Sequence, residues 1–443
     1  MSRNSNKKAI SFLKGMIIFL IGIVVGLLLL TAILNIGDKK EATSDHTINN
    51  IDQVESDVAN RTTEATQQIT TEAYSEQPAT EAPAATPDDA AAPVDQNADP
   101  DVEAILDKMS LHEKVCQLFV VTPEALTGYA QVTEFGDTSK QSFDQYPVGG
   151  IAYFSQNLES NEQTKAMLTG IQNYAKEKSG FPILLTVDEE GGTVARCAEK
   201  LNVPKIESMY NYKDQGTEKA YENSSTIAKY LKDLGFNMDC APVADTWSNP
   251  SNTVIGKRAY SDNYQQTAEL VGSAVKGYED NGIISCLKHF PGHGNTAEDS
   301  HTSTATTDKS IDQLRTEEYL PFQSGINSGC DVVMVGHITV TSISNDPATV
   351  SKDIVTGELR GKLGFNGVVI TDALNMGAIA NKYSSSGELA IKCIEAGDDM
   401  LLMINDFKSA EAAVEEAVKN GTISEDRIDE SVRRILKLKL SKK

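Results

Sequence analysis

Short apolar runs alternate with longer amphipathic stretches over residues 101–443. Each run has the length of one buried strand, and most stretches between runs place apolar residues at the spacing of one helix face. Eight such repeats predict a (β/α)8 TIM barrel, an α/β fold whose parallel strands read as continuous apolar segments. A doubly wound open sheet is the alternative, although no glycine-rich phosphate loop supports its nucleotide-binding form. The expected strands are 117–121, 148–154, 182–187, 236–243, 283–287, 332–335, 367–370 and 400–404.

Helical spacing is clearest in the stretches between these strands. The first amphipathic pattern runs from Val102 to Leu111, and its apolar surface continues to Phe119. The last helix should begin at Ser424, because acidic residues follow directly and basic residues come late, in the order that suits the helix dipole. The other expected helices are 163–178, 218–234, 264–281, 316–328, 387–396 and 409–419.

A different apolar segment precedes the barrel. Residues 16–34 contain no charged side chain and are about long enough to cross a bilayer as a helix. Lysine and arginine are more frequent before this run than after it, which predicts that residues 1–15 lie in the cytoplasm. We expect a transmembrane anchor at 16–36 with the following chain outside the cell. A cleaved signal sequence is the alternative.

Residues 37–98 should form a disordered acidic linker rich in Thr, Ala and Pro, because they hold too few large apolar residues to offset chain entropy. Between residues 41 and 100 there are thirteen acidic residues and one basic residue. This segment therefore carries about half of the formal net charge of −23. Such acidity argues against nucleic acid as a partner.

Six cysteines are widely spaced and never form C-x-x-C, which argues against a zinc ribbon. Most of them lie within or beside apolar runs, so we expect mainly free, buried thiols, with disulfides as the alternative.

Residues with titratable side chains are concentrated where the expected strands end. The stretch 288–301 holds three of the six histidines and follows the apolar run 283–287. In a barrel, catalytic groups come from the C-terminal ends of several strands, so this face is the expected active site. The residues at or just past strand ends are Asp188, Glu189, Glu190, Asp245, Lys288, His289, His337 and Asp372.

Asp372 ends the apolar run 367–370 and has two interpretations. It could cap the next helix, or it could act as a carboxylate nucleophile. Asp299 and His301 could supply the partner role, because a carboxylate raises the pKa of an adjacent imidazole and allows it to donate a proton. A carboxylate nucleophile with a separate proton donor is the apparatus of retaining glycoside hydrolysis.

The motif Lys-His-Phe-Pro-Gly-His-Gly at 288–294, followed by Asp299-Ser300-His301, resembles the signature of glycoside hydrolase family 3. The resemblance is to its β-N-acetylglucosaminidase branch, the NagZ-like enzymes. Segments 109–118, 187–196, 241–245, 254–260 and 371–376 agree with the family in the same order.

This resemblance implies one catalytic domain at 99–443, with no metal, no cofactor and no second family domain. It implies that Asp372 is the nucleophile and that His301, paired with Asp299, is the acid/base. The residues expected to bind the hydroxyls and acetamido group of a terminal N-acetylglucosamine are Asp188, Arg196, Arg258, Lys288 and His289.

The implied activity is that of a retaining exo-β-N-acetylglucosaminidase that forms a covalent glycosyl-aspartate and removes terminal GlcNAc from peptidoglycan fragments. Its partners would be β-linked GlcNAc glycans or muropeptides, and we expect a monomer held at the cell membrane with its catalytic domain outside. Phosphorolysis and cleavage of intact glycan stay open. One alternative is a metal-dependent barrel hydrolase using His289, His293, His301 and Asp372 as ligands. Another is a non-catalytic module that binds cell-wall carbohydrate.

Overall fold

The computed structural model describes residues 99–296 and 305–441; the expected anchor and linker, Asp299 and His301 lie outside these residues. Within them, eight strands form one sheet in the order β11-β9-β7-β6-β3-β2-β1-β12, and all neighbouring pairs are parallel. A parallel bridge between Ile370 and Met400 joins the two end strands, so the sheet is a nearly closed barrel. The strands are β1 Phe119–Val121, β2 Gly150–Ala152, β3 Leu184–Val187, β6 Met238–Asp239, β7 Ile284–Phe290, β9 Val332–Val335, β11 Val368–Thr371 and β12 Leu401–Leu402.

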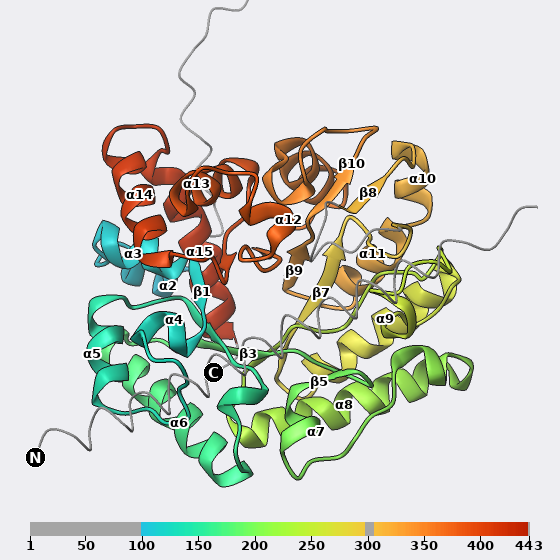
Figure 1. Cartoon of the computed structure of the whole chain (residues 1–443), viewed down its shortest axis with the longest axis horizontal. Helices are drawn as coiled ribbons and strands as arrows, with labels where there is room; N and C mark the ends of the chain where they lie inside the picture. The colour runs from blue at the N-terminus through green and yellow to red at the C-terminus, as the bar shows by residue number, and fades with distance from the viewer. Residues whose placement is uncertain (1–98, 297–304, 442–443) are drawn as a thin grey trace, which may run out of the picture. The chain divides into compact units, whose positions relative to one another are not determined.

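Helices surround these strands (Figure 1). The first and last elements lie side by side, because β1 pairs with β12 and α15 contacts α2 and α3. The helices are α2 Pro100–Leu106, α3 Leu111–Gln117, α4 Pro123–Thr127, α5 Asp137–Gln145, α6 Asn161–Ser179, α7 Arg196–Lys200, α8 Gly216–Leu234, α9 Tyr264–Glu279, α10 Ile311–Thr316, α11 Tyr319–Asn327, α12 Gly377–Ala380, α13 Ser386–Ala396, α14 Phe407–Lys419 and α15 Glu425–Ser441, with short or irregular helical segments η1 Ser155–Asn157, η2 Met209–Gln215, η3 Gly256–Arg258, η4 Ala348–Val350 and η5 Asp353–Lys362.

The arrangement fits the predicted (β/α)8 barrel, since each expected apolar run overlaps one strand of the sheet. The strand residues are buried, as expected for strands with helices outside and packed side chains inside. All six cysteines are buried and free. Among the helices that the structure describes, none is long and apolar enough to span a membrane.

One local prediction was wrong, and one helix was not predicted. The first amphipathic pattern is not one continuous helical surface: α2 ends at Leu106, and Ser110 starts α3 with a capping box in which Ser110 and Glu113 bond each other's backbone N–H groups. The segment 336–366 contains the helix η5, for which no helix was predicted although the buried Val355 and Leu359 are four residues apart. Two small sheets also lie outside the barrel, β4 Glu189–Gly191 with β5 Val194–Ala195, and β8 Ala305–Thr307 with β10 Ile338–Val340.

Candidate active site

The hairpin formed by β4 and β5 separates three consecutive acidic residues that follow β3. The Asp188 and Glu190 carboxylates bond Lys288, whereas the Glu189 carboxylate bonds elsewhere. Glu189 accepts hydrogen bonds from the Cys197 and Ala198 backbone N–H groups at 2.6 and 3.0 Å, so it caps the start of α7. Successive side chains of a strand point to opposite faces, which explains why one of the three carboxylates has a structural role.

The turn of this hairpin requires glycine. Gly191 and Gly192 have φ values of 90° and 62°, in the region that side chains other than glycine rarely adopt. A Cβ atom on Gly192 would lie 2.1 Å from the Ser208 Oγ, so the turn also packs too closely for a side chain. The glycine pair therefore shapes the loop that holds Asp188 and Glu190.

Four charged side chains from three segments form what we call the ion-pair group: Asp188, Glu190, Arg258 and Lys288. The Lys288 Nζ lies 2.7 Å from one oxygen of Asp188 and 2.7 Å from one of Glu190. Arg258 donates to both oxygens of Glu190, at 2.8 and 2.7 Å. The two positive and two negative charges balance, which allows this group to be buried at the end of the barrel.

The ion pairs determine how these groups titrate. Burial alone would raise the pKa of Glu190, but the charges of Arg258 and Lys288 outweigh it and hold that pKa well below its ordinary value. Burial alone would lower the pKa of Lys288, but Asp188 and Glu190 raise it above its ordinary value. Glu190, Arg258 and Lys288 therefore carry their full charges near neutral pH.

Asp245 orders the loop that follows β7. Its buried carboxylate lies 2.7 Å from the Nδ1 of His289 and accepts a hydrogen bond from the His293 backbone N–H at 2.6 Å. Gly294 allows this loop to pack closely against the backbone at Thr246, since a Cβ on Gly294 would lie 1.8 Å from the Thr246 carbonyl oxygen. The Asp245 contacts thus fix the orientation of the His289 ring.

Asp372 follows β11 directly and is not a helix cap, because α12 begins five residues later and has Met376 at its N-cap. The Asp372 backbone N–H donates to the Val335 carbonyl at 2.8 Å, and its Oδ1 accepts from the Ala373 N–H at 2.7 Å. Burial alone would raise the pKa of Asp372, but the imidazoles of His289 and His337 outweigh it and lower the pKa. The carboxylate is therefore ionised near neutral pH.

A cavity of about 570 Å³ brings these residues together at the C-terminal end of the barrel strands. Its volume suits a small ligand, since such pockets usually measure about 300–1,000 Å³. Asp372 and all five predicted sugar-binding residues line it. Apolar side chains complete its wall: Phe154, Val194, Val254, Ile255, Met334, Met376, Leu402 and Met403.

The family model described as "Glycosyl hydrolase family 3 N terminal domain" matches residues 110–438. The chain belongs to glycosyl hydrolase family 3.

This family 3 member is similar to proteins named β-hexosaminidases. It is 32% identical over 336 residues to Beta-hexosaminidase A of Pseudoalteromonas piscicida, covering 70% of this chain and 56% of that protein. It is 34% identical over 263 residues to a Beta-hexosaminidase of Stenotrophomonas maltophilia (strain K279a), covering 58% of this chain and 76% of that protein. The solved family 3 β-N-acetylglucosaminidase of Paenibacillus sp. str. FPU-7 superposes with a TM-score of 0.71 at 37% identity, covering 75% of this chain and 63% of that one. The chain thus spans little more than half of the Pseudoalteromonas protein and under two thirds of the Paenibacillus protein.

Sequence reasoning assigned no role to three residues that organise the site of this family 3 hydrolase. Glu190 joins Arg258 to Lys288, and Asp245 orients His289. The buried His337 donates from Nε2 to the Ala373 carbonyl at 3.0 Å, next to the candidate nucleophile. All three lie at or just past strand ends, and this position was the signal that could have indicated them. The residues that they contact are far away in sequence, so the contacts themselves could not be predicted.

Proposed function

We propose that this family 3 glycoside hydrolase is a retaining exo-β-N-acetylglucosaminidase that removes terminal GlcNAc from peptidoglycan fragments of the GlcNAc–MurNAc type. The observation that carries the proposal is the cavity that joins an ionised Asp372 to a polar wall of fixed charges. A retaining mechanism needs a carboxylate nucleophile at the sugar, and hydroxyl recognition needs oriented donors and acceptors. The names of the β-hexosaminidase relatives support the same sugar class.

Asp372 acts as the nucleophile in the first step. The Ala373 N–H holds its Oδ1, so Oδ2 attacks the anomeric carbon as the glycosidic bond breaks. His301 gives its proton to the departing oxygen, and Asp299 keeps the ring oriented and stabilises its charged form. A water molecule then attacks the anomeric carbon, His301 takes its proton back, and Asp372 leaves as a carboxylate.

The ion-pair group and two neighbouring residues hold the sugar. Lys288 and Arg258 offer N–H donors, and Asp188 offers an acceptor for a pair of hydroxyls. Arg196 lies with its guanidinium 5.8 Å from the centre of the Phe154 ring, so cation and ring together form a wall for the acetamido group. His289 completes the set, since Asp245 holds its ring from behind.

Activity on an aryl β-N-acetylglucosaminide tests the proposal. Asp372→Asn keeps the size of the side chain but removes the nucleophile, so hydrolysis should fall by at least about a thousandfold. Asp353→Asn, at an exposed aspartate at the start of η5, is the matched control and should retain activity. A fluorinated N-acetylglucosaminide should leave a sugar adduct on Asp372 that mass spectrometry detects. An adduct on another residue, or an active Asp372→Asn variant, would refute the assignment.

We infer further that residues 16–36 anchor the enzyme in the cell membrane and that its catalytic domain lies outside the cell. The apolar length of this segment and the basic residues before it support the orientation. Protease added to intact cells should release the barrel, whereas protection of the barrel from protease would contradict the orientation.

A further inference from the structure

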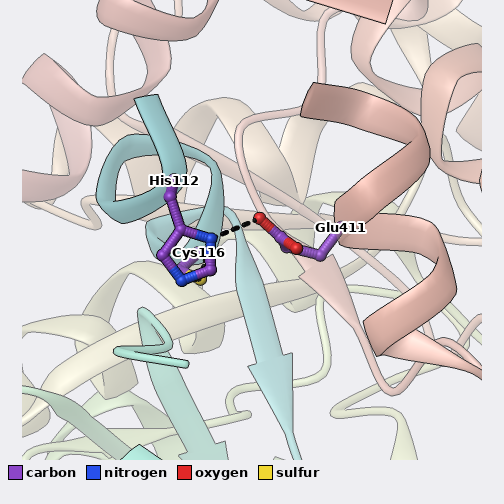
Figure 2. Close-up of side chains that lie close together, drawn as sticks. All are labelled: His112, Cys116 and Glu411. Carbon is purple, nitrogen blue, oxygen red and sulfur yellow. Dashed lines mark hydrogen bonds and ion pairs between the residues drawn. The ribbon is translucent and has the colours of Figure 1, made fainter. Parts of the chain in front are cut away.

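A cluster of metal-binding side chains lies between α3 and α14, outside the cavity described above. Figure 2 shows the Glu411 side chain reaching from α14 toward the His112 ring on α3, with Cys116 beside the ring. His112 and Cys116 are four residues apart on α3, and Glu411 and Glu415 are four apart on α14, so each pair shares one helix face. Among the residues that the structure describes, His112, Cys116 and Glu411 have ligand atoms close enough together to share a metal ion.

The hydrogen bonds of His112 direct one ring nitrogen at two carboxylates. Its Nε2 lies 2.9 Å from the Gln145 carbonyl oxygen, which can only accept, so Nε2 carries a proton. Its Nδ1 lies 2.9 Å from Glu411 and 3.0 Å from Glu415. Two negative oxygens can approach one ring nitrogen this closely only if a proton or a metal ion lies between them. A ligand histidine commonly donates its other N–H to a backbone carbonyl, which is the arrangement found here.

Cys116 adds a soft ligand atom. Its Sγ lies 4.0 Å from Nδ1 and 3.7 Å from Nε2 of His112, and within 4.8 Å of the ligand oxygen of Glu411.

We propose that His112, Cys116, Glu411 and Glu415 form a Zn²⁺ site that ties α3 to α14. The imidazole, thiolate and carboxylate ligands suit zinc, which prefers four of them in a tetrahedron. The ligand atoms of the first three residues all lie within 4.8 Å of one another. Zinc bonds of about 2.0–2.3 Å place neighbouring ligand atoms roughly 3.3–3.8 Å apart, so small side-chain rotations complete the site.

The cluster is accessible to solvent on one side, and a bound ion would join two helices. The His112 side chain is 38% exposed, whereas that of Glu411 is 6% exposed, so an ion can enter from solvent and reach a sheltered ligand. α3 leads into the start of β1, and α5 ends at Gln145 shortly before β2. None of the four residues lines the cavity that contains Asp372. Bound zinc would link the first and last parts of the barrel without entering the glycosidase chemistry.

Metal binding by the full chain tests this proposal. After treatment with a chelator, the protein should bind one equivalent of Zn²⁺ in calorimetry, and its melting temperature should rise when Zn²⁺ is added. Co²⁺ should produce a thiolate-to-metal charge-transfer band, because Cys116 is a ligand.

Two conservative variants and one control assign the ligands. Cys116→Ser should lose the charge-transfer band, and Glu411→Gln should weaken Zn²⁺ binding by at least about tenfold. Glu416→Gln, at an exposed residue of the same helix, should change neither result. Absence of binding, or binding that both variants leave unaltered, overturns the proposal and identifies the cluster as a histidinium bridged by two carboxylates. Aryl glycoside hydrolysis should be the same before and after chelation, so the outcome is separate from that of the proposed function.

Discussion

The buried ion-pair group makes a strong prediction about stability. Glu190→Gln preserves the size of a side chain that is 1% exposed but removes its charge. The Arg258 guanidinium and the Lys288 ammonium then share the single carboxylate of Asp188, and one buried positive charge is left without a counter-charge.

The magnitude follows from this imbalance. Removing one partner of a buried ion pair costs about 3–5 kcal/mol, because the remaining charge is neither solvated nor paired. The free energy of unfolding of a typical domain is about 5–15 kcal/mol, so the loss is a large fraction of it. Lys288→Met leaves the opposite imbalance and should also be destabilising. The double variant Glu190→Gln/Lys288→Met restores neutrality, so its loss should be smaller than the sum of the single losses by about 1–3 kcal/mol.

Denaturant unfolding measured by circular dichroism tests both numbers. Glu177→Gln, at an exposed residue of α6, is the control for the loss of a glutamate charge and should stay within about 0.5 kcal/mol of the parent. A loss below about 1 kcal/mol in Glu190→Gln would refute the reasoning. Strict additivity in the double variant would show that the two charges do not compensate each other.

Three further outcomes follow from the same structure. His301→Ala should lose more activity on glycosides with poor leaving groups than on activated aryl glycosides, since only the former need a proton; equal losses in kcat/KM would contradict the acid/base role. The pKa of Asp372 is lowered, so its carboxylate forms below the pH range in which an aspartate ordinarily ionises, and the acid limb of the activity profile should lie there. The alkaline limb should reflect loss of the His301 proton and vanish in His301→Ala with an activated substrate. Asp399→Asn should lower the free energy of unfolding by about 3 kcal/mol, because the buried carboxylate pairs with Arg360 at 2.6 Å and Arg434 at 3.0 Å; a melting temperature equal to that of the parent would be the contrary result.

The barrel was predictable because its signal is local. A strand inside a barrel must be apolar along its length, so a run such as 332–335 can be identified as a strand without knowing which strands lie beside it. The break between α2 and α3 was missed although Ser110 and Glu113 carry a capping-box pattern, because apolar spacing alone continued across it. The helix η5 was missed although Val355 and Leu359 are buried four residues apart, and the glycines at 357 and 361 weaken its helical pattern.

The residues of the candidate site could be predicted from the sequence, but most of the contacts between them could not. Strand-end position and family resemblance indicated Asp372 and the five sugar-binding residues, and the cavity brings all six together. The roles of Asp299 and His301 stay predictions from the motif, since both lie outside the described residues. Neither source indicated that Glu190 is the residue to which Arg258 and Lys288 both bind.

The sequence by itself determined the repeating strands and helices, the apolar segment at 16–34 and the chemistry-bearing motif at 288–301, because each is written in residues that are neighbours along the chain. Only the tertiary structure decided that Glu190 lines the cavity beside Asp188, whereas Glu189 does not. It also decided that the side chains of His112 and Glu411, about three hundred residues apart in sequence, lie within hydrogen-bond distance of each other. The physical reason is that charge pairing and metal ligation act through space over a few ångströms, and the closure of the barrel sets those distances.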